Sequence, residues 1–243
     1  ASLSYMKKEI QIGEQQTKFY QNALSLVETG NYHFALSSKN KLDRKQQKLL
    51  GEAVVEHFLR TTERTYQNDA VLTSLGLWNE WKAFESTPDF FQEGNEQVYQ
   101  RGMDPKNKVR SSTTLLDTAR WAARKDLPAI DIAQALAEYV TLARAEDNIY
   151  GLLEHRTKET ARQARTLAQE YHLPLMRERA EEQLVVHAQF DQERAKIGSY
   201  QEAARFNLEW LEDGRIAFDP NEIKAPFTFT NALKTGFRRP VMA

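Results

Sequence analysis

The chain has 243 residues, of which 41% are hydrophobic and 28% charged, and its formal net charge is −1. This balance selects no polyanionic partner, and the length is sufficient for one large domain or two small ones. Because the chain contains no cysteine, disulfides, thiolate catalysis and cysteine-ligated zinc or iron–sulfur sites are excluded. Glycine and proline are scarce and good helix formers dominate, which predicts an all-α fold.

Apolar residues recur at helical spacing through the first part of the chain. The strongest pattern includes Leu50, Val54 and Phe58, which fall on one helix face. Gly30 is placed to end the first helix, and Pro88 suits the first turn of a later one. The helices expected here cover residues 4–29, 32–37, 42–66, 69–85 and 88–100.

Prolines divide the second part of the chain. Pro128 interrupts one helical pattern, and Pro174 follows a break at His172. The pattern between them is longer than a typical globular helix, so we expect a bend near Gly151 or Thr157. The helices expected here cover residues 112–127, 129–170, 175–197 and 200–212.

The clearest internal loop is residues 101–111, which contain a glycine, a proline and four basic side chains. If the chain has two subdomains, their boundary is expected in this loop. The domains predicted in this way are an N-terminal helical subdomain over residues 1–105, a C-terminal helical subdomain over 106–212 and an extended arm over 213–243. One continuous helical domain is the alternative.

Residues 30–35 and 198–203 share the pattern Gly-x-Tyr-x-x-Ala, and each lies between two helical patterns. We expect a tight turn in which the glycine is left-handed, the tyrosine fills the gap and the alanine allows close helix approach. Both segments resemble the helix–turn–helix junction of tetratricopeptide repeats, which implies an array of helical hairpins. The copies that a continuous array would require between them are missing. An irregular multi-helix bundle is therefore the other expected architecture.

The arm over residues 213–243 differs from the rest of the chain, because its prolines and aromatic residues follow no helical period. This composition predicts an extended segment that docks on its own domain or on a partner chain, with disorder as a third alternative. Its candidate partner-binding residues are Phe227, Phe229, Phe237, Arg238 and Arg239.

Side chains that could carry chemistry have spacings that favour structural roles. His57 and His187 fall near apolar helix faces, and neither makes the Glu-x-x-His spacing of a carboxylate-bridged metal site. We therefore expect core histidines, and no metal or other cofactor. Asp147 lies on an apparent apolar stripe, so it is a candidate functional carboxylate unless the helix leaves the core there or an arginine pairs with it. Glycine-rich phosphate-binding motifs do not occur.

Basic residues gather in three groups that could contact phosphates. Aromatic residues are not interleaved with them, which favours solvated helix faces over a nucleic-acid site. The groups are Lys39, Lys41, Arg44, Lys45 and Lys48; Lys106, Lys108 and Arg110; and Arg120, Arg124 and Lys125.

These patterns favour a cytoplasmic, non-catalytic adaptor or scaffold that binds another protein, or a second copy of itself, and has no membrane span. Burial of apolar groups would drive binding, with charged side chains at the rim. We expect the partner to contact the arm and the loop residues Lys106, Lys108 and Arg110. The first alternative is a nucleic-acid-associated protein that uses basic residues within 39–48 and 106–125. The second is an enzyme whose active site is assembled from distant helices.

Overall fold

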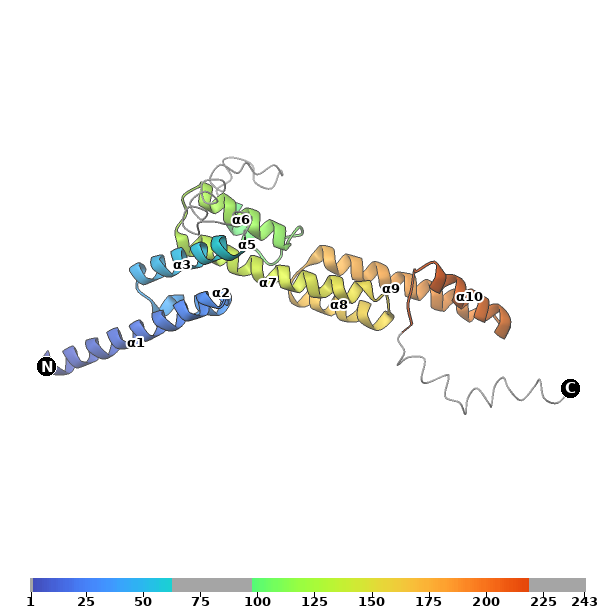
Figure 1. The fold of residues 1–243 in the computed structure, drawn as a ribbon, viewed down its shortest axis with the longest axis horizontal. Helices are drawn as coiled ribbons and strands as arrows, with labels where there is room; N and C mark the ends of the chain where they lie inside the picture. Colours follow the sequence, from blue (N-terminus) through green and yellow to red (C-terminus); the bar gives the residue numbers. More distant parts are fainter. Residues whose placement is uncertain (1, 63–97, 219–243) are drawn as a thin grey trace. The chain divides into compact units, whose positions relative to one another are not determined.

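A computed structural model of the chain describes residues 2–62 and 98–218, with side chains from residue 11 onward except that of Thr62. These residues form nine α-helices and one short 3-10 helix, with no strand among them (Figure 1), so the predicted all-α fold is confirmed. The helix expected at 69–85 and the residues of the arm beyond 218 lie outside the described residues. The chain divides into two compact units, residues 1–144 and 145–243.

The first unit is built around α3, whose buried face carries Leu50, Val54 and Phe58 as the sequence pattern predicted. Small residues of α6 and branched residues of α7, among them Ala119 and Leu136, belong to the same core. The elements of this unit are α1 (Ser2–Glu28), α2 (Tyr32–Ser37), the 3-10 helix (Lys39–Lys41), α3 (Arg44–Thr62), α5 (Val98–Met103), α6 (Ser112–Arg124) and the first part of α7 (Ala129–Glu154).

Two glycines of the first unit lie where helices approach closely. A Cβ on Gly51 of α3 would lie 2.5 Å from the backbone carbonyl carbon of Ala129, at the start of α7. A Cβ on Gly102 of α5 would collide with the hydroxyl of Thr118 in α6. Because real Cβ contacts are longer than this, any side chain at either glycine would push the helices apart.

The turn after α1 has the predicted geometry. Gly30 has φ +75°. Its N–H donates to the carbonyl of Val27, and the next N–H, of Asn31, donates to Leu26, both over 2.9 Å. This is the Schellman arrangement that satisfies the last carbonyls of a helix. Tyr32 and Ala35, the other two residues of the Gly-x-Tyr-x-x-Ala pattern, are buried in the core of the unit.

The boundary expected near residue 105 falls inside the first unit, because the structure divides within α7, after Arg144. Helix α5 continues to Met103, and Ser111 caps α6 by accepting from the N–H of Thr114. Arg110 is buried and forms a 3.0 Å ion pair with Glu138 of α7. These contacts tie the loop to the helices of its own unit, so its linker-like composition is misleading.

The second unit contains the rest of α7, then α8 (Lys158–Glu170), α9 (Pro174–Ala195) and α10 (Tyr200–Glu212). The bend expected near Thr157 is confirmed as a break between α7 and α8. Thr157 caps α8, because its hydroxyl accepts from the N–H of Thr160 over 3.1 Å. Buried alanines on both helices allow α8 and α9 to pack side by side (Figure 1): Ala161, Ala164, Ala168 and Ala180.

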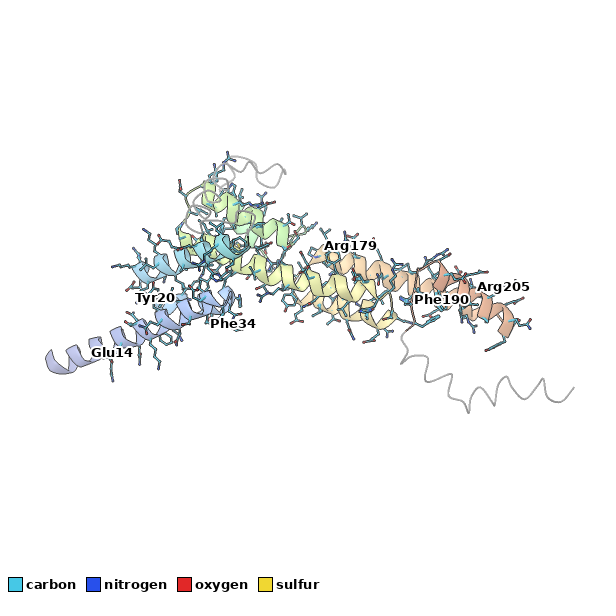
Figure 2. All side chains as sticks on the ribbon, viewed as in Figure 1. Glu14, Tyr20, Phe34, Arg179, Phe190 and Arg205 are labelled. Carbon is cyan, nitrogen blue, oxygen red and sulfur yellow. The ribbon has the colours of Figure 1, made fainter. Side chains whose placement is uncertain are left out.

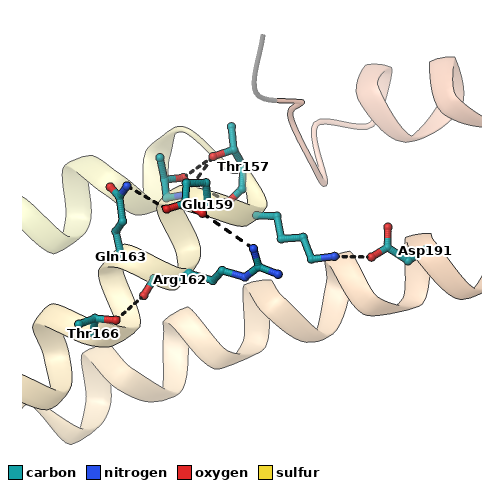
Figure 3. Close-up of polar contacts among 8 residues, drawn as sticks. Thr157, Glu159, Arg162, Gln163, Thr166 and Asp191 are labelled. Atoms are coloured by element: carbon teal, nitrogen blue, oxygen red, sulfur yellow. Dashed lines mark hydrogen bonds and ion pairs between the residues drawn. The ribbon is translucent and has the colours of Figure 1, made fainter. Parts of the chain in front are cut away.

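Polar contacts lie around the start of α8, and one of them joins α8 to α9 (Figure 3). Glu159 pairs with Arg162 over 3.8 Å and accepts a hydrogen bond from Gln163. Lys158 at the start of α8 forms a 2.6 Å ion pair with Asp191 of α9. The pair is partly exposed, so we expect it to orient the two helices more than it stabilises them.

The second Gly-x-Tyr-x-x-Ala segment forms a different turn. Gly198 does not have a left-handed φ, and Tyr200 is 79% exposed, so the predictions for these two residues are wrong. Only Ala203 behaves as expected, because it is buried. Ser199 caps α10 instead, and the turn needs no left-handed residue. The two matching segments therefore do not make a structural repeat, and a wider hairpin array stays a prediction.

Candidate interaction surface on α10

Helix α10 is held in the second unit by an aromatic cluster on one side. The ring of Phe190, on α9, lies 5.4 Å from the rings of Phe206, Trp210 and Phe218, measured between centroids. Figure 2 labels Phe190 where α9 approaches α10. Ile216 is buried in the same cluster. Aromatic pairs at this separation contribute about 0.5–1.5 kcal/mol beyond the area they bury.

The chain that follows α10 is fixed against the loop between α7 and α8. Arg156, at φ +54°, accepts two hydrogen bonds at its carbonyl: from the N–H of Ala217 over 2.8 Å and from Nε2 of His187 over 3.0 Å. Its guanidinium donates to the carbonyl of Gly214. The guanidinium of Arg215 lies 4.9 Å from the ring centroid of Trp210. Residues 214–218 are thus positioned beside α10 by both polar and apolar contacts.

A second side of α10 carries exposed apolar residues. Tyr200, Leu208 and Leu211 are 79%, 57% and 38% exposed, and Ala204 is exposed as well. Their spacing of four, four and three places all of them on one helix face, away from the buried Trp210. We call these residues the α10 outer face: Tyr200, Ala204, Leu208 and Leu211. An apolar face exposed in this way is typical of an interaction site.

Acidic residues dominate the charge of α10 and of the residue after it. Helix α10 and the residue after it carry four carboxylates and one guanidinium, that of Arg205 (Figure 2). Asp213 already pairs with Arg215 over 2.8 Å. The four carboxylates belong to Glu202, Glu209, Glu212 and Asp213. By helical spacing, Glu212 borders the α10 outer face, whereas Glu202, Glu209 and Asp213 lie on the other side of the helix.

The partner-binding residues predicted from the sequence lie elsewhere. Lys106 and Lys108 are exposed on the loop before α6, as expected. Arg110 is only 5% exposed, and its ion pair with Glu138 makes it a structural residue of the first unit. The arm residues fall outside the described part of the chain: Phe227, Phe229, Phe237, Arg238 and Arg239.

The first basic group is largely on the surface. Lys41, Arg44, Lys45 and Lys48 are exposed around the start of α3. Two of them have neighbours: Lys41 lies 4.5 Å from the ring centroid of Phe19, and Lys48 pairs with Glu52 over 3.8 Å.

Other predicted basic residues already have partners. The Lys39 ammonium donates to the side-chain oxygen of Gln134. Arg120 of the third group pairs with the partly buried Asp117 over 3.7 Å. Burial raises the pKa of Asp117, the largest effect, and Arg120 lowers it in part. Lys39 and Arg120 therefore contribute to the packing of the first unit, whereas Lys41, Arg44, Lys45 and Lys48 are exposed around the start of α3.

The residues considered as candidates for catalysis or metal binding lie in environments typical of ordinary surface or core residues. Asp147 is exposed, which agrees with the expectation that α7 leaves the core at this position and not with a buried functional carboxylate. The buried stripe in this part of α7 instead contains Ala145, Ile149 and Leu153. His187 is buried and bonded to a backbone carbonyl, as expected of a core histidine. Across residues 2–62 and 98–218, no three His, Asp or Glu residues converge as a metal site would require.

No protein-family model, curated protein or solved structure matches this chain. Within the described residues, no helix has an apolar stretch long enough to cross a bilayer.

The sequence prediction missed the α10 outer face, although its spacing is visible in the sequence. Helix α10 has apolar residues on two sides, because Phe206 and Trp210 lie away from Leu208 and Leu211. Periodicity cannot tell which of two apolar sides faces the core.

Proposed function

We propose that this chain is a non-catalytic helical adaptor that binds another protein through the α10 outer face. The observation that supports the proposal is the exposure of Tyr200, Leu208 and Leu211 on one side of a helix whose other side is anchored. A rigid helix that presents apolar groups loses little conformational entropy when a partner covers them. Burial then contributes about 25 cal/mol for each Å² of apolar surface removed from water.

The shape of the site favours a particular kind of contact. Side chains spaced by four, four and three can pack against an amphipathic helix or an extended apolar segment. Carboxylates at the rim, such as Glu212, would pair with basic residues of the partner and exclude acidic surfaces. The tyrosine at the start of the face offers a large ring, of the type enriched in the centres of protein interfaces.

Affinity capture with three forms of the full chain tests this function. The forms are the wild type, Leu208→Glu on the α10 outer face and Val185→Glu as the matched control. Val185 is also an exposed aliphatic residue, on α9 of the same unit. We expect a protein that is captured by the wild type and by Val185→Glu but lost with Leu208→Glu. Equal capture by all three forms would contradict a role for this face.

Nucleic-acid binding is the second candidate, and the exposed basic group at the start of α3 favours it. The positive end of a helix dipole adds to the charge of Arg44 and Lys45 at this position. If the group binds phosphates, retention on heparin or DNA should fall steeply with salt. Lys45→Glu should weaken retention more than Lys196→Glu, an exposed lysine after α9. Equal retention of the two variants would argue against this candidate.

A further inference from the structure

We infer that the first part of α1 mediates self-association, by pairing antiparallel with the same helix of a second copy of the chain. This surface belongs to the first unit and shares no residue with the α10 outer face. Self-association at α1 therefore adds to the proposed function and does not depend on it.

Helix α1 is long, and only its second half is packed against the rest of its unit. Ala23 and Val27, near its C-terminal end, are buried in the core that includes α2 and α3. The side chains of residues 11–18 are exposed, except for the half-buried Gln16, and the N-terminal end of α1 extends past α2 (Figure 1). The helix nevertheless continues from Ser2 to Glu28. An uncovered helix of this length is only marginally stable in water, so a partner that covers it would stabilise it.

The buried stripe of α1 continues toward the N-terminus as a heptad pattern in the sequence. Val27, Leu24 and Tyr20 form this stripe where α1 packs in the core. Steps of three and four residues back from Tyr20 lead to the positions on the same face of the uncovered part, which we call the α1 seam. The α1 seam consists of Leu3, Met6, Ile10, Gly13 and Thr17. Helices with such a seam pair side by side, and the residues at the seam influence the orientation.

The sizes of the seam residues are complementary when two copies run antiparallel. One antiparallel register sets Ile10 beside Gly13 of the second copy. In the same register, Met6 lies beside Thr17 of the second copy. Because the pair is two-fold symmetric, each of these layers occurs twice, and a large residue meets a small one in all four.

A parallel pair in register would lack this complementarity. It would place Gly13 beside Gly13, which leaves a gap in the middle of the interface. In the structure, no described atom outside α1 lies within 4 Å of a Cβ built on Gly13, so the helix surface there is open to a second copy.

Charged residues beside the seam favour the same orientation. In the antiparallel register, Lys7 lies opposite Glu14 of the second copy, and the two-fold symmetry repeats this pair. In a parallel pair, Glu9 would lie opposite Glu14, and this repulsion would also occur twice. Charge and side-chain size therefore select one occupant, a second copy in the antiparallel orientation.

Analytical ultracentrifugation of the full chain tests the inference by means of charge reversals. In the antiparallel pair, Glu14→Lys and Lys7→Glu each replace attraction by repulsion, and the double variant Lys7→Glu/Glu14→Lys restores attraction. In a parallel pair, Glu14→Lys would instead create an attraction to Glu9. Lys18→Glu is the matched control, because Lys18 is exposed and lies four residues after Glu14, away from the seam. Either single reversal at 14 or 18 therefore places like charges at the same helical spacing.

We expect a concentration-dependent equilibrium between monomer and dimer for the wild type. Glu14→Lys and Lys7→Glu should each raise the dissociation constant of the dimer by about tenfold, and the double variant should return it to near the wild-type value. Lys18→Glu should change it by less than about threefold. Circular dichroism at low concentration checks that all forms remain folded as monomers.

A tighter dimer with Glu14→Lys would overturn the antiparallel orientation. A wild type that stays monomeric at its highest soluble concentration would overturn self-association. A dimer that responds equally to Glu14→Lys and Lys18→Glu, or to neither, would assign the contact to a surface other than the α1 seam.

Discussion

The hydroxyl of Tyr32 lies 2.7 Å from Nδ1 of His57, inside the core of the first unit. The two rings meet edge to face with centroids 5.7 Å apart, and the contact joins the short helix α2 to α3. Burial raises the pKa of the Tyr32 phenol above its usual value. The second tyrosine of the same sequence pattern, Tyr200, is largely in water.

Removal of this hydroxyl should destabilise the first unit. Tyr32→Phe leaves a buried imidazole nitrogen without its partner, which costs about 1–3 kcal/mol of unfolding free energy. Urea denaturation followed by circular dichroism measures the change. Tyr200→Phe, the same substitution at the matching exposed position, is the control and should change stability by less than about 0.5 kcal/mol. Similar losses of unfolding free energy for both variants would show that the buried hydroxyl contributes no more to stability than the exposed one.

The two glycines of the shared pattern should respond differently to alanine. Gly30 has φ +75°, and a left-handed conformation costs an alanine about 1–2 kcal/mol. Gly198 has no left-handed φ, and no atom lies within 4 Å of a Cβ added there. We therefore expect Gly30→Ala to lower the unfolding free energy and Gly198→Ala to leave it unchanged or slightly higher. An equal loss of unfolding free energy in both variants would contradict the finding that the two glycines form different turns.

Two helical glycines provide a test of close packing. Gly51→Ala would place a methyl group against the backbone at Ala129, and overpacking of this kind costs about 1–3 kcal/mol. Gly151 lies in α7 with open space around it, so Gly151→Ala should stabilise by about 0.5–1 kcal/mol through helix propensity. Thermal unfolding should shift down for the first variant and up for the second. A rise in melting temperature with Gly51→Ala would refute the close approach of α3 and α7.

Tyr99 should make the fold sensitive to alkaline pH. Its pKa is raised, mainly by burial and further by the charges of Asp131 and Glu138, and its hydroxyl donates to the Asp131 carbonyl over 2.8 Å. A tyrosine in the unfolded chain ionises near its usual pKa of about 10. The contribution of Tyr99 to stability is therefore fully present below about pH 10 and is lost as pH rises toward its higher folded pKa.

Tyr99→Phe cannot ionise, so its unfolding free energy should fall less steeply between about pH 10 and 11.5 than that of the wild type. The variant also loses one hydrogen bond and should start about 1 kcal/mol less stable at neutral pH. Tyr200→Phe, at an exposed position, should retain the wild-type slope. A Tyr99→Phe slope that matches the wild type would assign the alkaline sensitivity to other groups.

Helix limits in the described residues could be predicted because their causes are local. The chain breaks at Thr157 because a threonine can cap α8, and it breaks before Pro174 because proline cannot continue the preceding helix. Gly30 ends α1 for a reason contained within a few residues, namely its left-handed conformation. Such features depend on backbone hydrogen bonds between residues that are neighbours in sequence, so a sequence pattern is sufficient to locate them.

At several positions, tertiary structure decided which side chains are buried. In the sequence, Arg110 belongs to a basic loop. In the structure, it forms an ion pair with Glu138, which is distant in sequence. Tyr32 and Tyr200 occupy the same place in one sequence pattern, but Tyr32 is buried in the core of the first unit and Tyr200 is exposed. On α10 both sides are apolar, and the position of Phe190 on α9 decides that Trp210 is buried and Leu208 is left for a partner. Periodicity reports that a helix has apolar faces, but which face is covered depends on side chains that the fold brings from elsewhere.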